Sequence, residues 1–344
     1  MKQICMDLGI NFREHKKYKK GIFKTKKEIE KELKEKGIKK IYYVLSFGGG
    51  TQSSHLLENH FKDKIHYDFI IFSDTGAEPE FIHNQVNWWI KRQKEFGNTT
   101  PFIITHHNSM EKGLEEMVMR YINTCYQRFQ LPVYCNKIDE KTGEEKHAGM
   151  MPRQCTIDFK IVPVKQKARR LILKQLGLRK RQRLPKDIAF IIDIGFSVDE
   201  IKRINLYQSP QYKYMYLAYP LVEMNLTTDY SIEFLKKNNM PSKRSRCYLC
   251  PFNCDNRGFE WKELIEEESL SFLKACYIDN KLREIQASGN KNMKSIPYLH
   301  YKRIPLEKAY WKNYEKIKRI YQKDLIAWID EWEKRIKDKY LKTA

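Results

Sequence analysis

The stretch that most constrains the fold is residues 41–57, IYYVLSFGGGTQSSHLL. An apolar, β-branched and aromatic run predicts a buried strand, three glycines predict a tight loop, and the hydroxyl and amide residues predict a helix start. At such a junction backbone N–H groups and the positive end of the helix dipole converge on one point. Glycine lets a phosphate approach the backbone and permits a positive φ. The pattern predicts an anion cradle, although a tight turn without a ligand would have the same local sequence.

Two common phosphate-binding loops do not match this stretch. No Gly-Lys-Ser or Gly-Lys-Thr follows the glycines, which excludes a Walker A loop. The GxGxxG spacing of dinucleotide-binding folds is also absent. The cradle therefore belongs to another class of loop.

The order of apolar runs along the chain predicts the fold class. Strand-like runs at 66–76, 101–107 and 187–197 alternate with helical patterns at 78–97 and 163–176. Alternating strands and helices are typical of an α/β fold in which helices flank a parallel twisted sheet. We therefore expect an α/β architecture that begins at the strand before the glycine loop.

Composition along the chain predicts three consecutive segments. We expect a basic helical extension over 1–40, an α/β nucleotide-binding domain over 41–226, and a cysteine-bearing, basic helical C-terminal region over 227–344. Residues 123–153 mix glycine, proline and charge, which predicts an irregular surface or lid segment.

The charge of the chain points to a polyanionic partner. The sequence has 65 Lys+Arg against 43 Asp+Glu, a formal net charge of +22, and the basic residues crowd 13–40, 165–186 and 302–342. Such an excess attracts nucleic acid, although a lysine-rich solvated surface is the alternative. No apolar run reaches the ~18 residues of a membrane span, and the N-terminus lacks a signal-peptide core. We expect a cytoplasmic protein with no membrane partner.

The cysteines predict a metal centre. Cys247, Cys250 and Cys254 lie within eight residues, and Cys155 could supply a further ligand from far away in the sequence. In a cytoplasmic chain, cysteines in a CxxC arrangement suit an iron–sulfur cluster or structural zinc better than disulfides. Free, unligated thiols are the alternative.

Polar residues near other element boundaries are candidates for contacts with the ligand. Asp74 follows a strand, where its carboxylate could bind a ribose hydroxyl or a divalent ion, or could cap the next helix. Arg153 and Lys160 flank Cys155, and Arg203 follows another strand end. These cations could hold phosphates or belong to a solvated basic face.

Five short motifs occur in a characteristic order: SFGGGTQS at 46–53, SDTG at 73–76, RQCT at 153–156, GFSVDEIKR at 195–203 and CYLCPF at 247–252. Together they resemble the PP-loop ATP pyrophosphatase superfamily. The closest resemblance is to its branch that contains phosphoadenosine phosphosulfate reductases and DNA-phosphorothioation-like sulfurtransferases. The resemblance implies an adenine nucleotide alpha hydrolase-like fold of the HUP type.

The same resemblance implies ATP and Mg²⁺ as ligands and cleavage of ATP between its α- and β-phosphates. The family loop reads Ser-Gly-Gly-x-Asp-Ser, so Gly48 replaces a serine and Gln52 replaces the aspartate that would support magnesium. Asp74 and Cys155 are the implied catalytic residues. The implied nucleotide-binding residues are Ser46, Gly48, Gly49, Gly50, Gln52, Ser53, Asp74, Arg153, Lys160 and Arg203. The implied metal ligands are Cys155, Cys247, Cys250 and Cys254, which would hold a [4Fe–4S] cluster or, alternatively, Zn²⁺.

The function expected from the resemblance and the charge is ATP-dependent adenylation of a nucleic acid, either tRNA or DNA, followed by insertion of sulfur. A cysteine desulfurase would be the sulfur-donating partner. One alternative is a phosphoadenosine phosphosulfate reductase, but this chain has no cysteine after Cys276, where those reductases carry a C-terminal thiol. The other alternative is a non-catalytic basic nucleic-acid-binding module with structural zinc.

Overall fold

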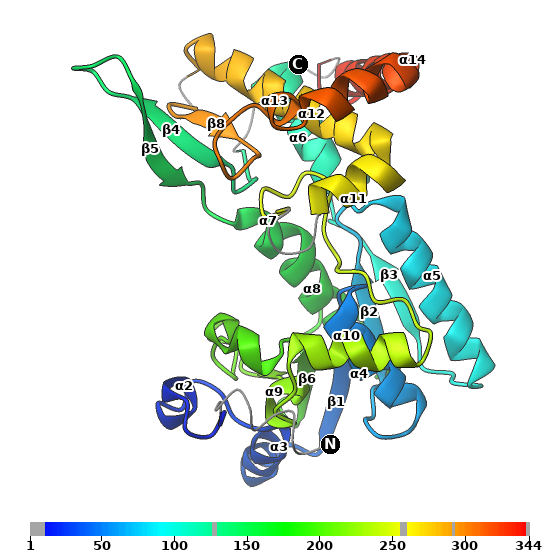
Figure 1. Cartoon of the computed structure of the whole chain (residues 1–344). Helices are drawn as coiled ribbons and strands as arrows, with labels where there is room; N and C mark the ends of the chain where they lie inside the picture. Colours follow the sequence, from blue (N-terminus) through cyan, green and yellow to red (C-terminus); the bar gives the residue numbers. More distant parts are fainter. Residues whose placement is uncertain (1–10, 126–128, 255–259, 291–292, 342–344) are drawn as a thin grey trace. The chain divides into compact units, whose positions relative to one another are not determined.

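The computed structural model describes residues 11–125, 129–254, 260–290 and 293–341 (Figure 1). Its described residues form two compact units, each assembled from segments that are separate in the sequence. Unit 1 is drawn from Met1–Ser73, Phe81–Thr105 and Val162–Ser245. Unit 2 is drawn from Asp74–Glu80, His106–Ile161 and Arg246–Ala344.

This division differs from the three consecutive segments expected over 1–40, 41–226 and 227–344. The helix expected in the N-terminal extension packs on the sheet of unit 1, because Ile29 and Leu33 share a core with Ile191. Sequence composition changes locally along the chain. It therefore does not reveal that one compact unit is assembled from segments that are separated in the sequence.

Unit 1 is built on a five-stranded, all-parallel sheet, so the expected α/β class is confirmed. The strand order is β3-β2-β1-β6-β7, and the order reverses between β1 and β6. Parallel sheets with such a reversal bind ligands at the carboxyl ends of the strands beside the reversal. The strands are β1 (Lys40–Phe47), β2 (Phe69–Ser73), β3 (Phe102–Thr105), β6 (Ile188–Ile194) and β7 (Met215–Ala218).

Helices cover both faces of this sheet because successive strand residues point to opposite sides. On one face Leu45 packs with Leu56 of α4 and Trp89 of α5. On the other face Val44 packs with Ile172 of α8. The helical elements are α2 (Lys16–Lys19), α3 (Lys26–Glu35), α4 (Thr51–Phe61), α5 (Glu80–Glu95), α8 (Val162–Gln175), the 3₁₀ helix η2 (Val198–Arg203), α9 (Pro220–Glu223) and α10 (Thr228–Lys237).

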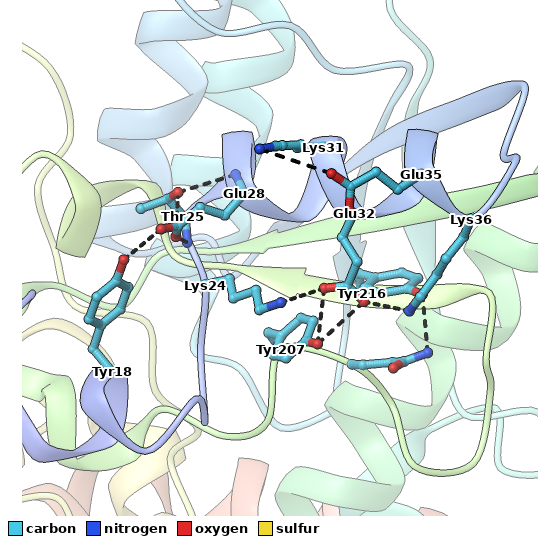
Figure 2. A network of polar contacts seen from close by, with 11 residues as sticks. Tyr18, Lys24, Thr25, Glu28, Lys31, Glu32, Glu35, Lys36, Tyr207 and Tyr216 are labelled. Atoms are coloured by element: carbon cyan, nitrogen blue, oxygen red, sulfur yellow. Dashed lines mark hydrogen bonds and ion pairs between the residues drawn. The ribbon is translucent and has the colours of Figure 1, made fainter.

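A network of charged and hydroxyl groups ties α3 to the β7 edge of the sheet (Figure 2). Glu32 accepts hydrogen bonds from Lys24 Nζ at 2.6 Å and from the Tyr207 hydroxyl at 3.0 Å, and it also pairs with Lys36. Lys36 Nζ is 3.4 Å from the Tyr216 hydroxyl on β7. The N-terminal charged network consists of Tyr18, Lys24, Thr25, Glu28, Glu32, Lys36, Tyr207 and Tyr216.

Unit 2 combines helices with a small antiparallel sheet of order β5-β4-β8. Its strands are β4 (Tyr134–Ile138), β5 (Glu145–Met150) and β8 (Ile296–Tyr298). Its helical elements are α6 (Gly113–Thr124), α7 (Gln154–Thr156), the π-helical turn η1 (Ile157–Ile161), α11 (Glu260–Glu267), α12 (Ser269–Ala287), α13 (Leu306–Ala309), α14 (Trp311–Ile336) and the π-helical turn η3 (Lys337–Leu341).

The prediction that residues 123–153 are irregular is wrong for 134–150, which form the β4–β5 hairpin. Most side chains of β5 are exposed, so the strand has no alternation of apolar and polar residues that the sequence could reveal. Residues 126–128 of that segment lie outside the described residues.

None of the described helices combines the length and the apolar character needed to cross a membrane.

Candidate functional site

The glycine loop joins β1 to α4, as the sequence predicts, and two of its three glycines are required, each for a different reason. Gly49 has a φ of +72°, and a Cβ there would lie 3.1 Å from the Phe72 ring. A Cβ on Gly50 would lie 2.8 Å from the backbone nitrogen of Ser245. Gly48 is different, because a Cβ there would meet only Ser53 Oγ at an ordinary 3.6 Å. Backbone geometry therefore requires glycine at 49 and 50 but not at 48.

Hydrogen bonds inside the loop leave most of its N–H groups free. The Gly48 N–H donates to Ser53 Oγ at 3.1 Å, and that hydroxyl donates to the Gly50 carbonyl at 3.0 Å. The Ser54 N–H begins the regular helix bonds by donating to the same carbonyl. Within the described part of the chain, five consecutive backbone N–H groups have no acceptor: those of Gly49, Gly50, Thr51, Gln52 and Ser53.

This row of N–H groups lies where the strand order reverses. β1, which precedes the loop, pairs with β6, and Gly195 follows β6 directly. A Cβ on Gly195 would lie 2.9 Å from the Ser53 nitrogen, so the end of β6 and the start of α4 are in close contact. Free N–H groups at the start of a helix, beside a reversal of this kind, form a site suited to phosphate.

Gln52 makes its polar contacts within unit 1. Its side-chain amide donates to Glu200 at 2.6 Å and lies 3.2 Å from the hydroxyls of Ser197 and Thr228. Gln52 therefore holds α4 to the segment after β6, and its expected contact with nucleotide stays a prediction that would involve the backbone N–H.

Two further residues expected to bind nucleotide lie in unit 1. Arg203 pairs with Glu200, and its guanidinium lies 4.2 Å from the centre of the Phe196 ring. Its side chain is 46% exposed, so it keeps donors for a ligand. Ser46 lies in β1 and is aligned with Ile71 and Ile194 on the neighbouring strands.

Asp74 belongs to unit 2 and stabilises a turn. Its Oδ1 accepts a hydrogen bond from the Gly76 N–H at 2.7 Å, and its Oδ2 lies 3.7 Å from His106 Nδ1. The alternative in which Asp74 caps the next helix is therefore wrong, because α5 begins only at Glu80. Its expected role with ribose or metal stays a prediction.

Sequence reasoning missed Glu78, which is fully buried close to the predicted residues. Its Oε2 accepts the N–H of Thr75 at 2.8 Å and also the Thr75 hydroxyl. Its Oε1 accepts no hydrogen bond from the described residues and lies 3.6 Å from Lys160 Nζ. Burial raises the pKa of Glu78, and the Lys160 ammonium opposes that increase. An acidic residue two positions after the SDTG motif was the available signal, but nothing in the sequence indicated its burial.

The structure brings the distant Cys155 near the CxxC cysteines. The hydrogen bond with Cys250 and burial raise the pKa of the Cys247 thiol, and Cys155 contributes to the same effect. Burial and Cys250 likewise raise the pKa of Cys155, while Arg153 and Lys160 lower it. Burial raises the pKa of Tyr134, and Cys254 and Cys250 add to that increase, so both thiols lie in the region of Tyr134. Cys155, Cys247 and Cys250 are therefore neighbours in unit 2, and Cys254 follows four residues after Cys250 in the chain.

Their present arrangement is not that of a closed metal centre. Among the described residues, no group of three or more His, Cys, Asp or Glu side chains is arranged to hold a metal ion. Arg153 lies beside these thiols, 4.7 Å from the centre of the Phe252 ring.

The predicted residues thus fall into two groups, one in each unit. The group in unit 1 contains Ser46, Gly48, Gly49, Gly50, Gln52, Ser53 and Arg203. The group in unit 2 contains Asp74, Arg153, Cys155, Lys160, Cys247, Cys250 and Cys254.

Comparisons with known proteins add no family assignment. No model of a protein family matches this chain, and no curated protein matches it. The resemblance to the PP-loop superfamily therefore rests on the five motifs themselves.

Proposed function

We propose that the chain is a cytoplasmic, ATP-dependent adenylating enzyme of the HUP type that modifies a nucleic acid by inserting sulfur. The observation that carries the proposal is the row of five free backbone N–H groups at the start of α4, beside the reversal of strand order. A polyphosphate is the ligand whose charge and number of acceptor oxygens suit such a row. ATP with bound Mg²⁺ supplies that polyphosphate, and Asp74 is the candidate carboxylate for magnesium.

The cradle gives these residues a defined part in the chemistry. An oxygen of the acceptor attacks the α-phosphorus of ATP, the bond from that phosphorus to the bridging oxygen breaks, and pyrophosphate leaves. Negative charge grows on the leaving pyrophosphate, and fixed N–H donors stabilise that charge without reorganising. The acceptor is then esterified to AMP, which a sulfur nucleophile displaces.

The thiols of unit 2 support sulfur as the inserted atom. Cys155, Cys247 and Cys250 are neighbouring soft donors, and soft thiolate ligands select iron–sulfur clusters or zinc over hard cations. These three residues would hold a [4Fe–4S] cluster, with Cys254 as a possible fourth ligand. When bound, the cluster would supply an iron site that can hold sulfide, which a thiol reductant would release from the persulfide of a cysteine desulfurase.

A matched pair of variants tests the cradle. Gly48 is the position at which a side chain fits without strain, so Gly48→Asp adds a carboxylate beside the free N–H groups and Gly48→Ala adds only bulk. We expect Gly48→Asp to weaken ATP binding at least about tenfold, because like charges are brought together. Gly48→Ala should bind ATP nearly as the unmodified protein does, as measured by titration calorimetry. Equal ATP affinity in both variants would refute the cradle.

A second experiment separates the proposed function from its two alternatives. Protein purified without oxygen is analysed for iron, zinc and its visible spectrum, and is then incubated with ATP and either tRNA or DNA. Iron with release of AMP and pyrophosphate supports the proposal. Sulfite released from phosphoadenosine phosphosulfate supports the reductase, and zinc without ATP turnover supports the binding module.

A further inference from the structure

One segment of unit 1 is basic without any acidic residue. Residues 162–186 contain ten lysines and arginines and no aspartate or glutamate. The segment comprises α8 and the connection from α8 to β6. Six of its basic side chains are exposed, and we call them the basic loop surface: Lys174, Arg179, Lys180, Arg181, Arg183 and Lys186.

The connection that carries most of these side chains is bridged by hydrogen bonds and anchored by a buried leucine. The Arg169 guanidinium, on α8, donates to the carbonyl of Lys180 at 3.1 Å and also to the carbonyl of Gln182. The Gln182 N–H donates to the Arg179 carbonyl at 2.9 Å, and the Gln182 side chain accepts the Arg179 N–H. Leu184 is buried in the core beneath α8. The cations are therefore displayed on an ordered turn.

The described carboxylates do not neutralise the basic loop surface. Among the residues that the structure describes, none of its six side chains forms an ion pair with Asp or Glu. Neighbouring cations without partners repel one another, and a polyanion relieves that repulsion when it binds. Three of the six are the arginines 179, 181 and 183, whose planar guanidinium groups match phosphate oxygens better than lysine does.

The residue types that the segment lacks indicate which polyanion it binds. No large hydrophobic side chain is exposed between 162 and 186, so the segment offers nothing to insert into a lipid bilayer. The segment also contains no aromatic residue, so it offers no ring on which an unpaired base could stack. With membrane insertion and base stacking excluded, the segment can contact a nucleic acid only through its phosphate backbone. That backbone is continuous and regular in paired nucleic acid.

We propose that the basic loop surface docks the phosphate backbone of double-stranded nucleic acid and holds it without reading its sequence. The claim that this surface holds the substrate of the enzyme rests on the proposed function. The claim that it binds nucleic acid can be tested without ATP. An RNA stem and a DNA duplex share this backbone chemistry, and the test distinguishes them.

The test compares two triple variants of the full chain that lose the same charge. One is Arg179→Gln/Arg181→Gln/Arg183→Gln, and the other is Lys64→Gln/Lys91→Gln/Lys94→Gln, at exposed lysines elsewhere in unit 1. Fluorescence anisotropy measures binding to an RNA hairpin, a DNA duplex and an unpaired strand over a range of salt concentrations. Binding to vesicles of phosphatidylserine and phosphatidylcholine is measured in parallel to test for a membrane partner.

The arginine triple should weaken binding to a duplex at least about tenfold, and the slope of log K against log salt should fall by roughly 3, or ~0.9 for each phosphate contact on DNA. The lysine triple should change binding less than about twofold. Preference for RNA or for DNA identifies the source of the backbone. Equal losses in both triples, an unchanged arginine triple, stronger binding to the unpaired strand, or arginine-dependent binding to vesicles alone would overturn the proposal.

ATP binding separates this proposal from the proposed function. The arginine triple should keep its ATP affinity, and Gly48→Asp should keep its duplex affinity. An unchanged ATP affinity in Gly48→Asp would refute the cradle without affecting the docking surface. An unchanged duplex affinity in the arginine triple would refute the docking surface without affecting the cradle.

Discussion

The N-terminal charged network and the basic loop surface are two lysine- and arginine-rich regions of unit 1 with opposite arrangements. In the network the cations meet carboxylates: Lys24 and Lys36 both bind Glu32 (Figure 2). In the basic loop surface the described cations have no carboxylate partner. Both regions contribute to the same net charge of +22. The difference teaches that clustered cations can be paired with carboxylates of their own region or left unpaired, and that acidic residues in the same fold element distinguish the two cases.

The largest expected effect is the loss of stability when the centre of the network is neutralised. Burial alone would raise the pKa of Glu32, but hydrogen bonds from Lys24, Lys36 and Tyr207 lower it to about 2. That depression, from 4.5, limits its contribution to about 3 kcal/mol, because each pKa unit corresponds to ~1.4 kcal/mol. Glu32→Gln should therefore lower the free energy of unfolding by about 2 kcal/mol at neutral pH, as measured by urea denaturation.

The matched control is Glu35→Gln on the same helix. Lys31 and Glu35 are 4.0 Å apart with side chains 81% and 65% exposed, so their pair should contribute less than about 0.5 kcal/mol. Equal destabilisation by the two variants would show that the network is no stronger than an exposed pair, and the comparison would fail.

The next effect is the pH dependence of the difference in unfolding free energy between the unmodified protein and Glu32→Gln. Since the pKa of Glu32 is lower in the folded state than in the unfolded state, ionised Glu32 stabilises the fold above pH 4.5. This contribution is lost as pH falls from 4.5 through about 2. The unfolding free energies of the unmodified protein and Glu32→Gln should therefore converge over that interval. A gap that stayed constant during acid titration would assign the stabilisation to packing.

The smallest expected effect is on the stability of an Arg181→Gln variant. Because Arg181 is exposed and pairs with none of the described carboxylates, the free energy of unfolding should change by less than about 0.5 kcal/mol. Thermal unfolding of Arg181→Gln beside the unmodified protein checks this value. A loss above about 1 kcal/mol would mean that Arg181 has a structural role, and the two regions would no longer be opposites.

The sheet of unit 1 could be predicted because its strands are buried and apolar. β2 and β6 are almost completely buried, so each reads as a continuous hydrophobic run with turn residues at its ends. The glycine loop could also be predicted, because the strand, the loop and the following helix are contiguous in the sequence. The pattern predicts a helix over about 53–61, and α4 begins two residues earlier, with the polar residues Thr51 and Gln52 in its first turn.

Apart from the approach of Cys155 to the CxxC cysteines, features that depend on distant contacts could not be predicted. β8 has only three residues, and it pairs with β4 more than a hundred residues earlier in the chain. The partners of Gln52 come from segments 145 to 176 residues away. Glu78 likewise pairs with Lys160, which lies far later in the chain. Local patterns of hydrophobicity carry no information about such pairings.

The interleaving of the two units has a consequence for biosynthesis. The chain passes between them five times, after residues 73, 80, 105, 161 and 245. On the ribosome, β1, β2 and β3 emerge early, but β6 emerges only after the 106–161 portion of unit 2. At about 5–20 residues per second, β1 keeps one unpaired edge for on the order of ten seconds. A nascent chain with such an exposed parallel edge is a natural client for a ribosome-bound chaperone.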